Sequence, residues 1–143
     1  MIRSANDDDT QAILDIWLAA SIAAHDFVPA EFWRAQLDDM RMRYLPASQA
    51  FVYEQEGRVV GFHALSGHTL AALFVQSEWQ GRGIGTALLS HARRLRGELT
   101  LSVYLANQPS VQFYLAQGFE TVCQRVDAHT GQLEWLMRAR PID

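Results

Sequence analysis

The chain has 143 residues, enough for one domain with a sizeable core, and 49% of them are apolar, a fraction typical of globular proteins. The formal net charge of −4 argues against nonspecific nucleic-acid binding, which requires a basic surface, and no apolar run approaches the length of a membrane span. The start of the chain lacks a signal-peptide pattern, and Cys123 is the only cysteine, so no internal disulfide can form. We therefore expect a cytoplasmic protein that binds neither membranes nor nucleic acids.

The N-terminal segment predicts a short strand followed by a helix. Residues 2–5 favour the strand. The acidic run after them is typical of a helix start, with Asp8 and Gln11 in the positions of a capping box. Apolar residues then recur at helical spacing from Ile13 onward. The acidic run is therefore interpreted as a helix cap and not as a metal site.

An aromatic corner at residues 25–28 separates this helix from a second one. Pro29 suits the first turn of the second helix, and Pro46 is predicted to end it. Two amphipathic helices joined by such a corner often wall a pocket, although simple core packing explains the same pattern. For His25 and Phe27 both interpretations stay open, because packing does not obviously require a loop histidine beside an acid.

Three strands are predicted in the middle of the chain. Residues 50–55, 59–65 and 70–75 are rich in strand-favouring residues and are separated by short turns that contain glycine. Such short turns predict an antiparallel meander, because a parallel pair needs a longer crossover. A helix is then predicted over residues 84–95, ended by Gly97.

The segment from Gln80 to Thr86 contains three alternating glycines between a predicted strand and a predicted helix. The unpaired N–H groups and the positive dipole end of a helix N-terminus form an anion site, most often for phosphate. A tight turn before a helix explains the same glycines. Thr86 stands where a dinucleotide fingerprint needs its last glycine, and no Gly-Lys-Ser/Thr of a nucleotide P-loop follows.

The last third of the chain predicts a strand, a helix and two more strands. Residues 99–105 alternate as a strand and follow a helix, so this strand is expected to run parallel to the one before the glycine loop. Asn107 begins the next helix, and residues 119–126 and 133–139 form the final strands. These elements predict an α/β (α+β) fold in a single domain, residues 1–143, with a mixed, mostly antiparallel sheet of six or seven strands and helices on both faces.

Two motifs, together with this order of elements, resemble the GNAT superfamily of acyl-CoA-dependent N-acetyltransferases. The first is Leu73-Phe74-Val75 followed by Gln80-Gly81-Arg82-Gly83-Ile84-Gly85, and the second is Asn107 followed by Phe113-Tyr114-Leu115-Ala116-Gln117-Gly118-Phe119. His25-Asp26-Phe27 combined with Asn107-Gln108-Pro109 is most similar to small single-domain bacterial members of the YiaC and YjaB kind, some of which act on lysines of proteins. The resemblance covers nearly the whole chain.

The resemblance implies acetyl-CoA as the co-substrate, with no metal. The pyrophosphate would lie on backbone N–H groups of the glycine loop, and the pantetheine arm would pair with the strand before it, in a cleft where two parallel strands splay apart. The cofactor-binding residues it implies are Leu73, Phe74, Val75, Gln80, Gly81, Arg82, Gly83, Ile84, Gly85, Thr86 and Asn107.

The implied chemistry is direct attack of a neutral amine on the thioester carbonyl. A free lysine amine, with a pKa of about 10.4, is almost wholly protonated at neutral pH. A backbone N–H near Val75 would stabilise the developing negative charge, and Tyr114 would act as the general acid that protonates the departing thiolate.

The general base is where the sequence departs from the family pattern. Many members carry a glutamate at the position of Ser102, and a serine hydroxyl is no base at neutral pH. Deprotonation must then come from His25, from Glu78 through water, from His68 or from bulk solvent, and we favour His25, as base or substrate contact. Phe27 and Ser102 are the other predicted substrate contacts.

Two functions follow as hypotheses. The first is an acetyl-CoA-dependent N-acetyltransferase that acts on a small amine, a peptide N-terminus or a protein lysine. The second is a non-catalytic acyl-CoA-binding sensor or interaction domain, which the missing acid at Ser102 favours. The partner is thus an amine acceptor, either a small molecule or a protein, and the sequence leaves monomer and homodimer equally open.

Overall fold

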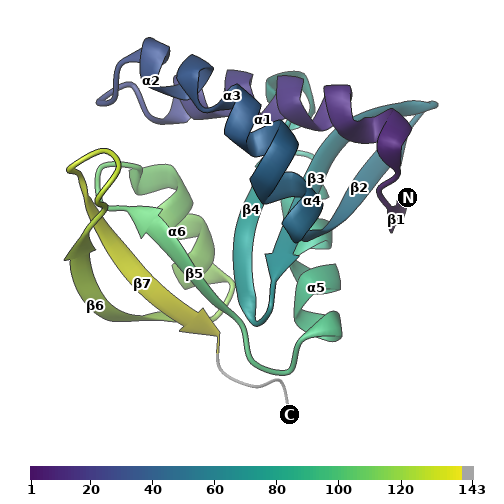
Figure 1. The fold of residues 1–143 in the computed structure, drawn as a ribbon. Helices are drawn as coiled ribbons and strands as arrows, with labels where there is room; N and C mark the ends of the chain where they lie inside the picture. Colours follow the sequence, from purple (N-terminus) through teal and green to yellow (C-terminus); the bar gives the residue numbers. More distant parts are fainter. Residues whose placement is uncertain (140–143) are drawn as a thin grey trace.

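The computed structural model describes residues 1–139, in which seven strands form one sheet. The strands are β1 (Ile2–Ser4), β2 (Gln49–Gln55), β3 (Arg58–Ser66), β4 (Thr69–Val75), β5 (Thr100–Tyr104), β6 (Phe119–Val126) and β7 (Leu133–Ala139). Their spatial order is β1-β2-β3-β4-β5-β7-β6 (Figure 1). The predicted order of elements and the antiparallel β2-β3-β4 meander are confirmed.

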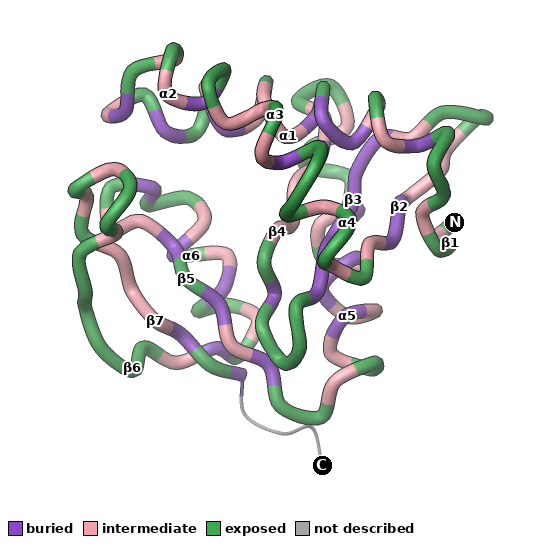
Figure 2. Tube along the Cα trace, viewed as in Figure 1, coloured by how far each residue is buried: buried purple, intermediate pink, exposed green. Residues whose placement is uncertain are grey.

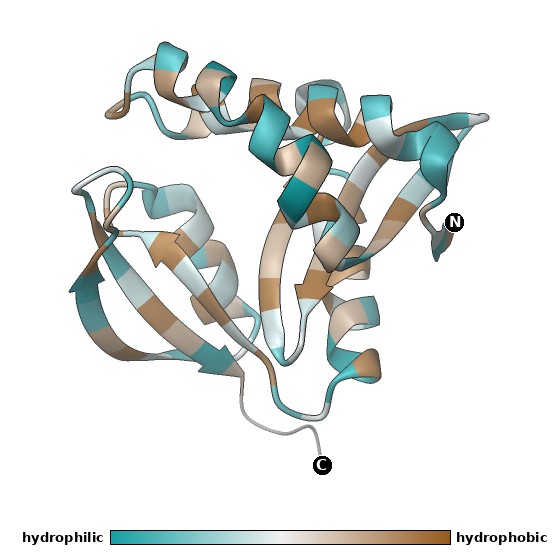
Figure 3. Ribbon diagram, in the orientation of Figure 1, coloured by the Kyte–Doolittle hydropathy of each residue, from teal (hydrophilic) through white to brown (hydrophobic). Residues whose placement is uncertain are grey.

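The helical segments lie on both faces of this sheet. They are η1 (Asp7–Asp9), α1 (Thr10–Ala24), α2 (Ala30–Ala35), α3 (Leu37–Asp39), η2 (Met40–Tyr44), α4 (Leu45–Ala47), η3 (Ser77–Trp79), α5 (Ile84–Leu95) and α6 (Gln108–Ala116). In Figure 3 the helices above the sheet alternate between hydrophobic and hydrophilic residues, as expected for helices with one buried face. Within the described range, no helix is both long and apolar enough to cross a membrane.

The sheet is antiparallel except for the β4–β5 pair, as predicted. These two strands are parallel and pair only at Thr69 and Thr100, near one end of each strand. Beyond that point they diverge, as Figure 1 shows. The splayed parallel pair expected at the cofactor cleft is therefore present.

A bulge in β3 determines which side chains face which helix. The register between β2 and β3 shifts after the Tyr53–Gly61 pair, which leaves Val60 as an extra residue. Val60 consequently packs with Leu88 of α5, whereas Phe62 packs with Ile13 of α1 on the other face. The bulge thus divides the side chains of β3 between α5 on one face and α1 on the other.

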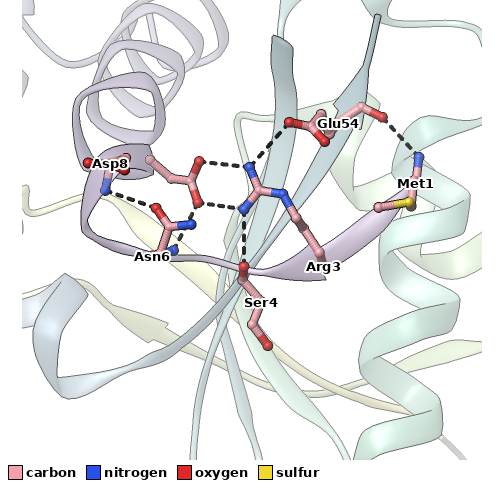
Figure 4. Close-up of polar contacts among 7 residues, drawn as sticks. Met1, Arg3, Ser4, Asn6, Asp8 and Glu54 are labelled. Carbon is pink, nitrogen blue, oxygen red and sulfur yellow. Dashed lines mark hydrogen bonds and ion pairs between the residues drawn. The ribbon is translucent and has the colours of Figure 1, made fainter. Parts of the chain in front are cut away.

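The helix cap predicted from Asp8 and Gln11 is wrong by two residues. The capping box consists of Asn6 and Asp9: the Asn6 side chain accepts from Asp8 N–H at 2.9 Å, and the Asp9 carboxylate accepts from Asn6 N–H at 2.9 Å (Figure 4). Arg3 explains the shift, because its guanidinium binds Asp9 at 2.8 Å and holds the pKa of that carboxyl below its usual range. This network ties β1 to the start of α1.

The second predicted helix is a series of short segments from α2 to α4, with Pro29 as the N-cap of α2. Pro46 does not end the series, because it lies inside α4, which ends at Ala47. Proline is tolerated in the first turn of a helical segment, since its missing N–H has no partner there. The π-helical turn η2 precedes α4, and in it Leu45 N–H donates to the Met40 carbonyl. The segment that contains Pro46 begins directly after this turn.

Candidate active site

Two hollows meet where β4 and β5 diverge. The larger, which we call the cleft, has a volume of about 930 Å³ and lies between the end of β4, the glycine loop, α1 and α6. The smaller, which we call the inner cavity, has a volume of about 220 Å³ and is lined by α1, α2, β4, β5, α6 and β7. The residues common to both are Leu73, Phe74, Asn107, Ser110 and Tyr114.

The glycine loop forms one end of the cleft. Gly81 and Gly83 have φ angles of +77° and +83°, and a Cβ atom at either would meet nothing within 4 Å. Both positions therefore favour glycine because of their backbone conformation, and the space above them is open. Gly83 is the N-cap of α5 without a side-chain cap, and the first intrahelical bond runs from Ala87 N–H to its carbonyl at 3.0 Å. The N–H groups of residues 84–86 thus precede the first helical bond and are suited to an anion.

Not every predicted loop residue presents its side chain to the cleft. Ile84 is buried in the core between β3 and α5, so only its backbone can contribute. The Arg82 guanidinium lies 4.7 Å from the ring centre of Trp79 and does not line the cleft. Gln80 lines the cleft and donates to the Val75 carbonyl at 3.1 Å, which fastens the loop to the end of β4.

The end of β4 forms the floor of the cleft. Leu73, Phe74 and Val75 all line it, and each pairs on its other side with β3. Because β5 pairs with β4 only at Thr69, the β5-facing edge of residues 73–75 has no sheet partner among residues 1–139. Such an edge can bind an extended, amide-containing ligand as an added strand.

Asn107 sits at the junction of the two hollows and caps α6. Its Oδ1 accepts from Ser110 N–H at 3.4 Å, so its amide group faces His25, whose Nε2 lies 3.1 Å away. Because the amide donates, Nε2 of His25 is the acceptor. The second amide N–H of Asn107 donates to no residue in the described range. It is therefore available for the predicted cofactor contact.

His25 lines the inner cavity, and its surroundings favour a role as a wall or substrate contact over that of a base. Burial lowers the pKa of His25 to about 4, so the ring is neutral at pH 7. Its basic nitrogen is engaged by Asn107. The ring packs against Tyr104 and Phe27, with centroids 5.0 and 5.6 Å away. Phe27 itself lines neither hollow.

Tyr114 lines both hollows from α6. Burial raises the pKa of its phenol, so the hydroxyl keeps its proton at neutral pH. The ring is held between Phe113 and Phe119, with centroids 5.3 and 5.5 Å away. A protonated phenol at this junction is placed to donate to a group that bridges the cleft and the inner cavity.

The other candidates for deprotonation differ in position. Glu78 lines the cleft, whereas His68 lines neither hollow and lies 3.2 Å from the Glu98 carbonyl. Ser102 lines the inner cavity, and its hydroxyl accepts from Arg125 at 2.5 Å. Among the residues that the structure describes, no group of three or more His, Cys, Asp or Glu is arranged to hold a metal ion.

Sequence reasoning missed two sets of lining residues. One is a set of small residues on α1 that leaves room for the cleft: Ala19, Ala20, Ala23 and Ala24. Their repeat after one helical turn was a readable signal. The other is Glu134 of β7, which lines the inner cavity because β7 pairs with β5, placing Glu134 opposite Tyr104. No local pattern could have shown that pairing.

Comparison with known proteins gives a consistent result. The model of the acetyltransferase (GNAT) domain matches residues 46–121. The chain is 38% identical over 138 residues to the peptidyl-lysine N-acetyltransferase YiaC of Escherichia coli K12, covering 96% of this chain and 94% of that protein. It is 35% identical over 120 residues to the peptidyl-lysine N-acetyltransferase YjaB of the same organism, covering 83% and 81%.

The solved structures agree. The solution structure of apo YjaB from Escherichia coli superposes with a TM-score of 0.86 and 29% identity, covering 99% of this chain and 98% of that one. The PaiA N-acetyltransferase from Thermoplasma acidophilum, solved in complex with coenzyme A, superposes with a TM-score of 0.83 and 16% identity, covering 98% of each chain.

Proposed function

The chain belongs to the GNAT family of acetyltransferases, and from this premise we propose that its acceptor is the side-chain amine of a lysine in a peptide or protein. The resemblance predicted from the two motifs is confirmed, and the chain is an acetyl-CoA-dependent N-acetyltransferase. Both relatives named above act on peptidyl lysine. The observation that supports a separate place for this acceptor is the inner cavity, a second hollow that shares Tyr114 with the cleft.

The cleft fits acetyl-CoA, which supplies an activated acetyl thioester when bound. The open space above Gly81 and Gly83 and the N–H groups at the start of α5 suit its pyrophosphate. The unpaired edge of residues 73–75 suits the amides of its pantetheine arm. Asn107 completes this set at the junction.

The residues at the junction divide the chemistry between them. The neutral amine attacks from the inner cavity, in a ternary complex and without a covalent enzyme intermediate. A backbone N–H at the end of β4, near Val75, stabilises the negative charge that develops on the thioester oxygen. Tyr114 then gives its proton to the leaving thiolate, and the proton that the nitrogen loses as the amide forms restores the phenol. His25 serves as a wall of the acceptor site, and the amine loses its proton to solvent, directly or through Glu78.

The cellular location, the absence of nucleic-acid and membrane partners and the oligomeric state stay predictions. The cytoplasmic location, which the single, exposed Cys123 suits, awaits a direct measurement. The protein is expected to act without nucleic acid or membrane, as a monomer or homodimer.

The test is an acetylation assay with short peptides whose N-termini are blocked. A peptide with one lysine is incubated with the protein and acetyl-CoA, and the product is identified by mass. We expect one acetyl group on the lysine. A matched peptide with arginine in place of lysine should stay unmodified. A third peptide has a free N-terminus and no lysine. Acetylation of that peptide, with no acetylation of lysine in the blocked peptide, would contradict the proposed acceptor and leave the family assignment intact.

A further inference from the structure

The inner cavity contains one charged side chain among the described residues that line it, the carboxylate of Glu134. This side chain is 15% exposed and comes from β7. Because β5 and β7 are antiparallel with Tyr104 opposite Glu134, Glu134 lies on the same face of the sheet as Tyr104 and Ser102. The strand next to β5 thus places a carboxylate on the face of the sheet that carries Ser102.

A cation already occupies the space beside this carboxylate. Arg125 of β6 donates from Nε to Glu134 Oε1 at 2.9 Å and from Nη2 to Ser102 Oγ at 2.5 Å. Arg125 does not itself line the inner cavity, and half of its side chain is exposed. It sits on β6, the edge strand that is exposed over most of its length (Figure 2). The guanidinium can therefore leave without disturbing the core.

The remaining walls of the inner cavity favour a cationic guest. Trp17, Trp33 and Tyr104 contribute aromatic rings, and their faces attract cations when water is excluded. An ammonium group in this cavity would have the aromatic residues and the Glu134 carboxylate among its neighbours, and Tyr114 lines the same cavity.

We propose that Glu134 binds and orients the amino group of the acceptor. Arg125 binds the Glu134 carboxylate in the absence of the acceptor, and the acceptor displaces it. The inference rests on the proposed function. An ammonium donates N–H groups to the carboxylate, and after losing its proton the neutral amine still has N–H groups to donate. Glu134 thus holds the amine in both states and leaves its lone pair free to point toward the cleft. The assignment concerns binding and orientation, and Glu134 takes part in no covalent step.

The test compares two variants that break the same ion pair. Glu134→Gln removes the carboxylate charge, so the KM for a lysine peptide should rise about tenfold, the value of a charge-assisted hydrogen bond. Arg125→Gln removes the competing cation, so the KM should fall by roughly threefold, the scale of a half-exposed pair. The dissociation constant of acetyl-CoA, measured by titration calorimetry, should change in neither.

The same strand pair offers a matched control. Arg138 of β7 and Glu120 of β6 form an ion pair of the same type, with Nε and Oε1 3.1 Å apart, and neither lines the cleft or the inner cavity. Glu120→Gln and Arg138→Gln should leave the KM for the peptide unchanged. A purely structural role of the Glu134–Arg125 pair predicts that both of its variants shift KM in the same direction.

The outcomes separate this inference from the proposed function. Opposite shifts of KM in Glu134→Gln and Arg125→Gln support it. Shifts of the same sign, or no shift in Glu134→Gln, overturn it while peptide acetylation by the wild type stands. If the wild type binds acetyl-CoA but acetylates no lysine peptide, the proposed acceptor and the role of Glu134 fail together. If Glu134→Gln does not fold, Arg125→Gln still tests the inference. An unchanged or raised KM in that variant is then sufficient to overturn it.

Discussion

Tyr114 is the residue at which the two hollows and the proposed chemistry meet. It lines both the cleft and the inner cavity, and burial keeps its hydroxyl protonated. Its neighbour Asn107 cannot replace it as a proton donor of comparable acidity, because an amide N–H is not acidic. The Tyr114 hydroxyl is therefore the single group on which the proposed proton transfer to the thiolate depends.

Tyr114→Phe removes that hydroxyl and preserves the ring that packs against Phe113 and Phe119. We expect kcat to fall about 100-fold, the usual contribution of a general acid, with little change in acetyl-CoA affinity. Steady-state kinetics and calorimetric titration measure the two effects separately. Tyr44→Phe is the control for the loss of a hydroxyl, because Tyr44 is exposed and lines neither hollow, and it should change neither quantity. Full activity of Tyr114→Phe would remove Tyr114 as the acid.

At the scale of elements, the contact between α5 and β3 fixes where the glycine loop points. Gly61 makes that contact possible: a Cβ atom there would lie 3.1 Å from the Phe74 carbonyl oxygen and 3.2 Å from Leu88 Cδ1. Either α5 or β4 must move to admit a methyl group. The glycine loop leads into α5, and the end of β4 forms the floor of the cleft. A substitution that moves either element should therefore change both the stability of the protein and its affinity for acetyl-CoA.

Gly61→Ala should lower the free energy of unfolding by about 1–3 kcal/mol, as overpacking of a core does, and weaken acetyl-CoA binding. Denaturant unfolding and calorimetry measure the two effects. Gly97→Ala is the control, because a Cβ atom there meets nothing within 4 Å. If Gly61→Ala matches the wild type in both measurements, α5 is not held as closely as we describe.

Across the whole molecule, two buried histidines make stability depend on pH. Burial lowers the pKa of both His25 and His63 from 6.5 to about 4, and His63 Nε2 lies 2.9 Å from His91 Nδ1. Below pH 6.5 the unfolded chain binds protons at these positions, while the folded chain does not until about pH 4. The free energy of unfolding should thus fall as the pH drops through this window.

The expected loss at pH 5 relative to pH 7.5 is roughly 1–2 kcal/mol per histidine, after a discount for partial solvent screening. Denaturant unfolding across this range measures it. His63→Leu should reduce the slope, and the exposed His129→Gln should retain it. Loss of stability that begins only below pH 4 would point instead to carboxylates such as Asp9, whose pKa is lowered by Arg3.

The sequence predicted the elements well because their signals are local. Residues of alternating polarity and the glycine turns between them predicted the meander. The glycines at 81 and 83 lie in the turn before α5, as predicted, with positive φ angles. The capping box was misplaced because Arg3, on another element, draws Asp9 into it. Glu134 was missed for a similar reason, since only strand pairing brings β7 beside β5. Contacts between side chains of different elements leave no periodic pattern to read, even where the elements are neighbours in the chain, as for Arg3 and Asp9.

The glycine loop and the end of β4 together form the proposed acetyl-CoA site. The most direct measurement is calorimetric titration of the wild type and of Gly83→Asp with acetyl-CoA. Aspartate places a negative charge and a side chain in the open space above the loop, where we place the pyrophosphate. Gly57→Asp is the matched control, because Gly57 has a φ of +75° and open surroundings but lies in the β2–β3 turn and lines neither hollow.

We predict that the wild type and Gly57→Asp bind acetyl-CoA with the same affinity and that Gly83→Asp shows no measurable binding. Equal binding by all three proteins, or none by the wild type, would contradict the claim.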